Sequence, residues 1–145
     1  MKNGIIFLAL ILISVVSFGQ LILESDKLSY QMGTDVGETV KETGFVIHEH
    51  AISVKQSDNT LRLVSLSEWG ETENPENEDQ TAIYTDGVDE HGTDWNFWII
   101  MDNKTGEVNV YMFTGDNDIH IIFEINIEKY NQREQKKWDA SKLLS

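Results

Sequence analysis

Cysteine is absent from this 145-residue chain, and proline occurs once, at Pro75. Without cysteine the chain can form no disulfide, thiolate metal site or cysteine nucleophile, and it has no residue for a lipid-modified cysteine anchor. The fold must therefore be held by side-chain packing and hydrogen bonds alone, which one domain of this length can supply.

Basic residues are also scarce, with 11 Lys and Arg against 25 Asp and Glu, for a formal net charge of −14. Proteins bind nucleic acid and anionic lipid largely through Lys and Arg. We therefore expect no nucleic-acid partner. We interpret the acidic surface first as a source of solubility, with cations and basic proteins as the alternative partners.

Long apolar runs are missing except at the N-terminus. Lys2 is followed by an apolar run over residues 5–16 and by Ser17-Phe18-Gly19 before Gln20. This order is typical of a secretory signal peptide, and the run is too short for an ordinary membrane span. We expect cleavage near Gln20, no membrane insertion afterwards, and a secreted or periplasmic product of about 125 residues. Loss of Lys2 changes the net charge from −14 to −15.

The rest of the chain alternates apolar and polar residues, with turn residues at short intervals, which predicts an all-β protein. A polar stretch after Gly33, with Gly37 and Gly44 as breakers, interrupts the pattern, and residues 70–80 are expected to form the only long loop. We predict strands over residues 28–32, 45–47, 51–55, 60–66, 81–88, 95–101, 107–113 and 119–127. We predict turns at residues 48–50, 57–59, 89–92, 102–106 and 115–117, with Gly106 in the left-handed region.

Short connections favour antiparallel neighbours, so we expect a single-domain meander of about eight short strands, either a small barrel or a two-sheet sandwich. Residues 95–101, 107–113 and 119–127 should be consecutive central strands, because residues 95–101 and 119–127 carry apolar side chains on both faces. The predicted core contains Val54, Leu61, Leu63, Ile83, Phe97, Ile99, Val108, Val110, Ile121 and Phe123.

The C-terminal segment has a different composition. The chain therefore divides into a signal peptide (residues 1–19), an all-β domain (20–130) and a basic C-terminal helix or tail (131–145). Asn131 followed by Glu134 fits a helix N-cap with its reciprocal carboxylate, and Trp138 is the expected docking residue.

His48 and His50 are the most suggestive metal-binding pair. Residues two apart on an extended strand point to the same face, and two imidazoles can bind one zinc ion. A third ligand would have to come from His91, His120 or a carboxylate. The pair lies between two predicted strands, however, so we favour surface histidines in a turn and assign no metal ligand.

Acidic residues crowd a span without Lys or Arg, namely Glu68, Glu71, Glu73, Glu76, Glu78, Asp79, Asp86, Asp89, Glu90 and Asp94. Calcium binds oxygen ligands of this kind, but the spacing of an EF-hand loop is absent, and Asp116-Asn117-Asp118 is too short to form a site alone. We therefore favour a solvated loop whose internal partner is the basic C-terminal segment.

Two tryptophans and one sequon are the remaining candidates for recognition. Trp69 borders the acidic loop as a candidate exposed anchor, while Trp98 is expected to be core rather than ligand contact. The sequence Asn103-Lys104-Thr105 matches a glycosylation sequon, although the hairpin turn explains it sufficiently. No nucleophile elbow or phosphate-binding loop occurs, and we assign no catalytic or cofactor-binding residue.

One resemblance accompanies these patterns. The leader ending in SFGQ, the segment SDKLSYQ at residues 25–31, the VDEHG turn at residues 88–92 and the closing strand pair are similar to small secreted β-rich proteins of Bacteroidota that have no assigned function. The resemblance implies an envelope or extracellular β domain, and it transfers no catalytic residue.

For function, we favour a secreted or periplasmic, non-enzymatic binding module that contacts a protein or an envelope component. The first alternative is a carrier of a small apolar ligand in a barrel pocket. The second is a small metal- or carboxylate-dependent hydrolase. A cavity of about 300 Å³ or more, reaching Trp95 or Trp98, would favour the carrier.

Overall fold

The computed structural model describes residues 20–74 and 77–144. These residues form β1 (Leu21–Met32), β2 (Asp35–Ile47), β3 (Ile52–Gln56), β4 (Asn59–Leu63), β5 (Gly70–Asn74), β6 (Asn77–Val88), β7 (Asp94–Asp102), β8 (Val108–Thr114), β9 (Ile119–Ile125) and α2 (Ile127–Leu144). The expected signal peptide, residues 1–19, lies outside the described residues. No helix in the described part of the chain is both long and apolar enough to span a membrane.

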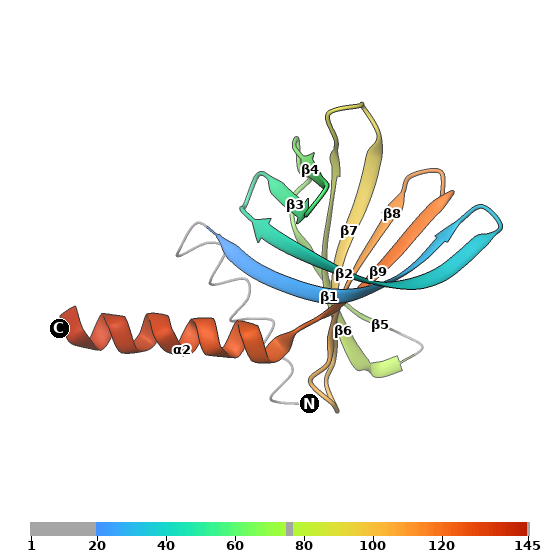
Figure 1. Cartoon of the computed structure of the whole chain (residues 1–145). Helices are drawn as coiled ribbons and strands as arrows, with labels where there is room; N and C mark the ends of the chain where they lie inside the picture. Colours follow the sequence, from blue (N-terminus) through green and yellow to red (C-terminus); the bar gives the residue numbers. More distant parts are fainter. Residues whose placement is uncertain (1–19, 75–76, 145) are drawn as a thin grey trace.

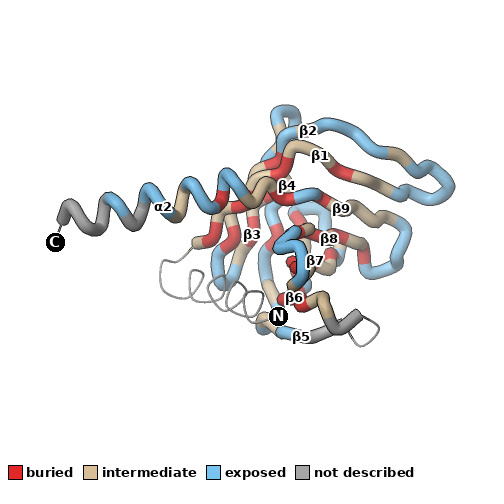
Figure 2. The backbone as a smooth tube through the Cα atoms, turned by 90° about the horizontal axis from the view of Figure 1, so that it is seen from below, coloured by how far each residue is buried: buried red, intermediate tan, exposed pale blue. Residues whose placement is uncertain are grey.

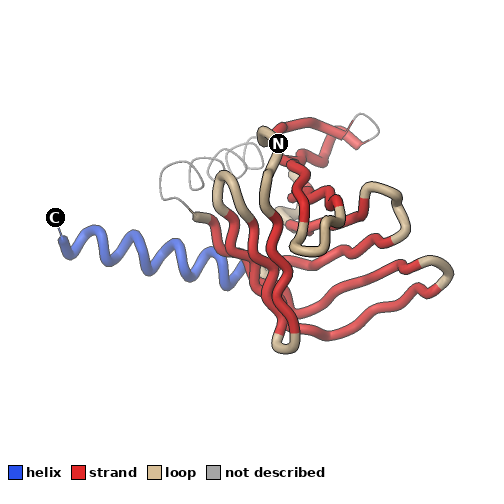
Figure 3. The backbone as a smooth tube through the Cα atoms, turned by 90° about the horizontal axis from the view of Figure 1, so that it is seen from above, coloured by secondary structure: helices blue, strands red, loops and turns tan. Residues whose placement is uncertain are grey.

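All the strands belong to one antiparallel sheet, in the order β4-β3-β2-β1-β9-β8-β7-β6-β5. Two meanders, β1 to β4 and β5 to β9, are joined where β1 pairs with β9. The sheet curls into a half-barrel, and α2 projects from it (Figures 1 and 3). The predicted all-β antiparallel meander with a C-terminal helix is confirmed, as one curled sheet rather than a two-sheet sandwich. The predicted adjacency of β7, β8 and β9 is also confirmed.

A β-bulge in β1 helps the sheet to curl. The register with both neighbouring strands shifts between Ser25 and Lys27: Asp26 is an extra residue of β1 against β9, whereas against β2 the extra residue lies in β2, between Val40 and Thr43. Bulges bend a strand and increase its twist. The buried positions of β1 accordingly run Leu21, Leu23 and Ser25, and then Leu28. The buried Ser25 hydroxyl donates a hydrogen bond to Lys27 O at 2.9 Å, which satisfies it.

The two edges of the curled sheet meet through residues 64–69, which join β4 to β5 and which we call the strap. Val64 exchanges two backbone hydrogen bonds with Val88 of β6, at 2.9 and 3.0 Å. Ser67 N then donates to Asp86 O at 2.9 Å. The strap therefore covers the part of β6 that β5 leaves unpaired.

The core fills the concave side of the sheet, and buried positions alternate along its strands (Figure 2). At its centre, Phe45 of β2 contacts Phe123 edge-on at 5.0 Å between ring centroids and Phe97 at 6.0 Å. These contacts join the two meanders across the curl. Of the predicted core residues, Leu61 and Ile121 are half-buried against this cluster, and the other eight are buried.

Three predicted features are wrong. In each case, backbone pairing forms a strand that no clear apolar alternation marks in the sequence. The polar stretch after Gly33 is strand β2, which pairs with β1 from residue 35 onward. The far half of this hairpin lies beyond the core, with Met32, Val36 and Val40 exposed, so it needs no inward apolar face. The first strand begins at Leu21 rather than at residue 28. The bulge interrupts the apolar alternation of this strand, so the sequence pattern did not show its first half.

The third wrong prediction is the long loop over residues 70–80, which instead forms β5 and the start of β6. β5 is an edge strand, and its described side chains, Glu71 and Thr72, are exposed. Gly70 lies beneath the Tyr84 ring, where a Cβ atom would collide with the aromatic carbons. Edge strands of this kind carry little apolar pattern, so the sequence did not reveal it.

The helix begins at Ile127, four residues before the predicted cap at Asn131. The N-cap is Asn126, whose Oδ1 accepts a hydrogen bond from Lys129 N at 3.1 Å. The buried Tyr130 docks the first turns against the core. Arg133 contacts Glu24 of β1 at 2.7 Å. The Trp138 side chain, expected to dock the helix, lies outside the described residues.

Candidate functional site

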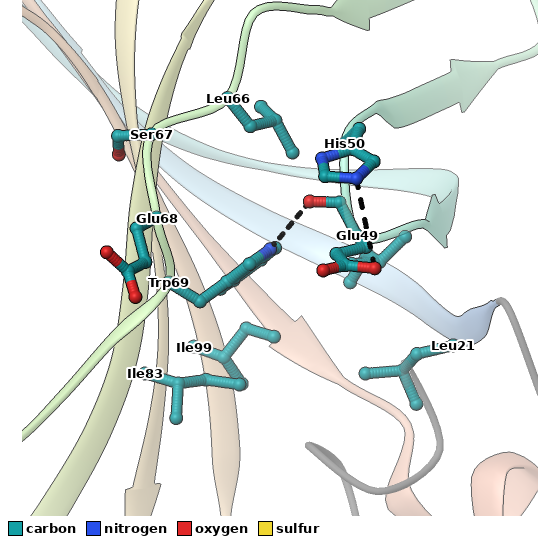
Figure 4. Close-up of a pocket in the computed structure, with 10 residues that line it drawn as sticks. Leu21, Glu49, His50, Leu66, Ser67, Glu68, Trp69, Ile83 and Ile99 are labelled. Atoms are coloured by element: carbon teal, nitrogen blue, oxygen red, sulfur yellow. Dashed lines mark hydrogen bonds and ion pairs between the residues drawn. The ribbon is translucent and has the colours of Figure 1, made fainter. Parts of the chain in front are cut away.

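A cavity of about 390 Å³ lies between the β1–β2–β3 part of the sheet and β6–β7, beneath the strap (Figure 4). We call it the pocket. Its lining comes from six parts of the chain, namely β1, β2, the β2–β3 turn, the strap, β6 and β7. The lining residues are Leu21, Ile47, Glu49, His50, Leu66, Ser67, Glu68, Trp69, Ile83 and Ile99.

The wall of the pocket is apolar because inward-facing strand positions form it. Leu21 begins β1, Ile47 ends β2, and these two residues are paired in the sheet. Ile83 of β6 and Ile99 of β7 form a second pair on the opposite side. All four side chains are at most 1% exposed. Leu66 completes the apolar wall from the strap.

Hydrogen bonds to β6 position the strap. Ser65 has φ of 53°, a left-handed conformation uncommon outside glycine, which turns the strap. Thr85 Oγ1 donates to Ser67 O at 2.7 Å, and Asp86 N donates to Ser67 Oγ at 3.0 Å. Ser67 Oγ also lies 3.1 Å from Thr85 Oγ1. The one hydroxyl among the lining residues is thus engaged in hydrogen bonds with β6.

Trp69 ties the strap to the β2–β3 turn. Its indole Nε1 donates a hydrogen bond to Glu49 O at 3.1 Å, and its ring meets Phe97 edge-on at 6.4 Å between centroids. Trp69 was predicted as a candidate exposed anchor beside an acidic loop. In the structure it is half-buried and forms part of the pocket wall. The ring cannot rotate without breaking the bond to the turn.

The rim of the pocket carries polar side chains from the turn and the strap. His50 Nε2 lies 3.8 Å from Glu49 Oε2, and these side chains are 86% and 62% exposed. His48 and His50 lie in a turn, as predicted. Within residues 20–74 and 77–144, no three His, Cys, Asp or Glu side chains are grouped so as to hold a metal ion. His120 of β9 stacks on Phe113 of β8, while His91 lies in the β6–β7 turn.

The acidic span is distributed over several elements, and Asp89 has a structural role. Its carboxylate accepts hydrogen bonds from His91 N at 2.8 Å, Thr93 N at 3.0 Å and Trp95 Nε1 at 3.0 Å. Burial by itself would raise the pKa of Asp89, but the hydrogen bonds from Trp95, Thr93 and His91 outweigh it and hold that pKa below its usual value. Asp89 therefore anchors the β6–β7 turn to the core through Trp95.

Arg133 of the basic C-terminal segment does not pair with the acidic span, a pairing that was predicted for this segment. Lys129 and Arg133 of α2 contact Glu24 and Asp26 of β1 instead, because the helix leaves β9 directly beside β1. Asp79 pairs with Lys104 of the β7–β8 turn at 3.0 Å.

Asp116 also serves a turn. It accepts hydrogen bonds from Thr114 Oγ1 and Asp118 N, which lower its pKa. This geometry is that of a side-chain-supported turn rather than a calcium site.

The remaining candidates are accounted for by packing. Trp98 does not lie in the core as expected; it is half-buried and stacks on Tyr84 at 4.5 Å with 18° between the planes. Trp95 is the core tryptophan, 7% exposed. Asn103 of the sequon exchanges side-chain hydrogen bonds with Thr81 at 2.7 and 3.0 Å, so its amide is in structural use. Gly106 has φ of 76°, which confirms the predicted left-handed turn position.

No protein-family model matches the chain, and neither a curated protein nor a solved structure matches it.

Proposed function

We propose that this protein is a non-enzymatic, exported binding protein whose pocket takes a small, largely apolar molecule. The observation that carries the proposal is the pocket itself, at about 390 Å³. Small-molecule sites usually measure about 300–1,000 Å³ and combine an apolar wall with a few polar groups. The pocket has both features, and its volume exceeds the value expected of a carrier, although Trp69 lines it in place of Trp95 or Trp98.

The size of the pocket limits its ligand. At about 30 Å³ for each molecule of liquid water, the space corresponds to roughly thirteen waters. A ligand of roughly a dozen non-hydrogen atoms is consistent with that volume. Its polar group would point to the rim, because Glu49, His50 and Glu68 lie there and the four residues of the inner wall are aliphatic.

Titration with the neutral fluorescent probe 1-naphthylamine, whose size is within that limit, tests the proposal. A Leu66→Trp variant places a large ring in the pocket and should weaken probe binding about tenfold or more. Leu61→Trp is the matched control, since Leu61 is also a half-buried leucine against the core but does not line the pocket. Thermal melts establish that both variants fold. Absence of probe binding to the wild type, or equal losses in both variants, would contradict the proposal.

A second candidate function is protein interaction through the β1–β2 hairpin. The observation that favours it is the exposure of aliphatic side chains there, with Val36 69% and Val40 83% exposed. A photocrosslinking residue at position 36 should give a discrete adduct in cells that the same residue at the exposed Thr60 of β4 does not give. Equal or absent adducts at the two positions argue against this function.

Export is proposed from the leader alone. Mass spectrometry of the native protein should find an N-terminus near Gln20 in the periplasm or the medium. An intact Met1 in the cytosol would contradict export without affecting the pocket.

A further inference from the structure

The rim of the pocket carries charge of one sign. Glu49 and Glu68 are among the lining residues, which include no Lys or Arg. A third carboxylate, Glu71, lies opposite Ile83 in the β5–β6 register. Directly opposed residues of an antiparallel pair point to the same face, so Glu71 extends toward the side of the sheet that Ile83 lines.

These carboxylates lack a Lys or Arg partner within the described residues, and the one imidazole beside them is His50, 3.8 Å from Glu49 Oε2. The lysine and arginine ion pairs found there join Lys27 to Glu38, Lys41 to Asp58, Lys104 to Asp79, and Lys129 and Arg133 to the carboxylates of β1. None involves Glu49, Glu68 or Glu71. The potential at the rim is therefore negative, in a chain whose net charge is −14.

Trp69 adds a second feature that suits a cation. An indole ring attracts ammonium groups over its face, and desolvation strengthens that attraction. The hydrogen bond from Nε1 to Glu49 O fixes this ring at the rim, and Figure 4 shows it lying between the apolar wall and the β2–β3 turn. An apolar wall and a fixed indole beside carboxylates together form an amphiphilic site with a negative mouth.

We infer that the ligand is a cationic amphiphile, with an ammonium group at the rim beside Glu49 and Glu68 and an apolar part against Ile83 and Ile99. This inference rests on the proposed function and names its ligand class. A carboxylate head of the same length is disfavoured because it would approach like charges at the rim.

Three ligands with one alkyl chain test the inference, namely octylammonium, octan-1-ol and octanoate, each displacing the neutral probe at low ionic strength. Octylammonium should bind about threefold to tenfold more tightly than octanol, and octanoate more weakly than octanol, because exposed charges contribute modestly in water. The differences in affinity among the three ligands should shrink in about 0.5 M NaCl, where the Debye length is only a few ångströms.

Paired variants separate the rim from the overall charge. The double variant Glu49→Gln/Glu68→Gln should lose most of the octylammonium advantage and leave octanol binding within about twofold. Glu90→Gln/Glu107→Gln, two exposed glutamates outside the pocket, changes the net charge equally and should keep the advantage.

The outcomes distinguish the two proposals. If the probe binds and octanol displaces it, but the order is not ammonium, alcohol, carboxylate, the cationic ligand class is wrong and the pocket function stands. The same holds if the control variant loses the advantage as fully as the rim variant does. If the probe does not bind, or if none of the three ligands displaces it, the pocket function itself fails.

Discussion

Two tryptophans show how differently two regions of this small sheet are built. Trp95 lies in the filled core, and its indole N–H binds the carboxylate of Asp89. Trp69 lies half-buried at the pocket, and its indole N–H binds a backbone carbonyl of the β2–β3 turn. In the filled region the indole binds a carboxylate that also holds the β6–β7 turn, whereas the pocket is bounded by the strap and the β2–β3 turn.

Side-chain size accounts for the difference along β7. Phe97 reaches across the curl to Phe45, while Ile99, two residues later on the same face, faces the pocket. An aromatic ring spans the distance between the two meanders and an aliphatic side chain does not. A cavity therefore persists beside a well-packed core, and the variants that follow test this contrast from the largest expected effect to the smallest.

Phe45→Ala should have the largest effect, because it removes the ring that contacts both Phe97 and Phe123. Truncating a buried phenylalanine typically lowers the free energy of unfolding by about 3–5 kcal/mol. Urea denaturation measures the loss, with Phe45→Leu as the milder variant if the alanine protein does not fold. A loss below about 1 kcal/mol would show that the centre of the core is not tightly packed.

Asp89→Ala should lower the free energy of unfolding by about 2 kcal/mol, since it leaves the buried Trp95 N–H without its charged acceptor. The effect depends on pH. Because the folded-state pKa lies below the ordinary value of 3.8, the stabilisation is complete above 3.8 and is lost as the pH falls through the folded-state pKa.

A comparison with Asp89→Asn checks the sign of this pH dependence. The stability difference between wild type and Asp89→Asn should be constant near neutral pH and should shrink as the pH falls from 5 to 2. A difference that grew on acidification would mean that the folded-state pKa is raised rather than lowered.

The smallest effect is expected at Leu66, and Leu63 of the same chain segment provides the contrast. Leu63→Ala removes a side chain that is 0% exposed and should cost about 2–5 kcal/mol. Leu66→Ala, three residues later in the strap, removes a half-buried side chain beside an existing cavity and should cost about 1 kcal/mol or less. Equal losses in thermal and urea unfolding would show that the strap is as tightly packed as the core.

The strands that build the filled core could be predicted from local pattern. Alternation along residues 95–101 placed Phe97 and Ile99 on the buried face, and the glycine of the β7–β8 turn has the left-handed conformation that was expected. β2 and β5 could not be predicted in the same way. Their far or outer residues are solvated, so no apolar alternation marks them, and only pairing with β1 and β6 makes them strands.

The pocket was the part least accessible to prediction. The sequence singled out three of its lining residues for other roles: Trp69 as an exposed anchor, His50 as one of a metal-binding pair, and Glu68 as part of an acidic loop. What unites them is the path of the strap, which depends on backbone hydrogen bonds between Val64 and Val88 and between Ser67 and Asp86. No local signal in the sequence specifies those pairings, because the partners are about twenty residues apart.

The amino-acid sequence by itself determined the all-β class, the antiparallel order of β7 to β9, most of the core and the acidic charge, because these follow from local periodicity, turn chemistry and composition. Only the tertiary structure decided that β1 pairs with β9, that the strap covers β6 and that a cavity remains beside Ile83 and Ile99. These features depend on which distant segments meet and on whether their side chains are long enough to fill the space between them.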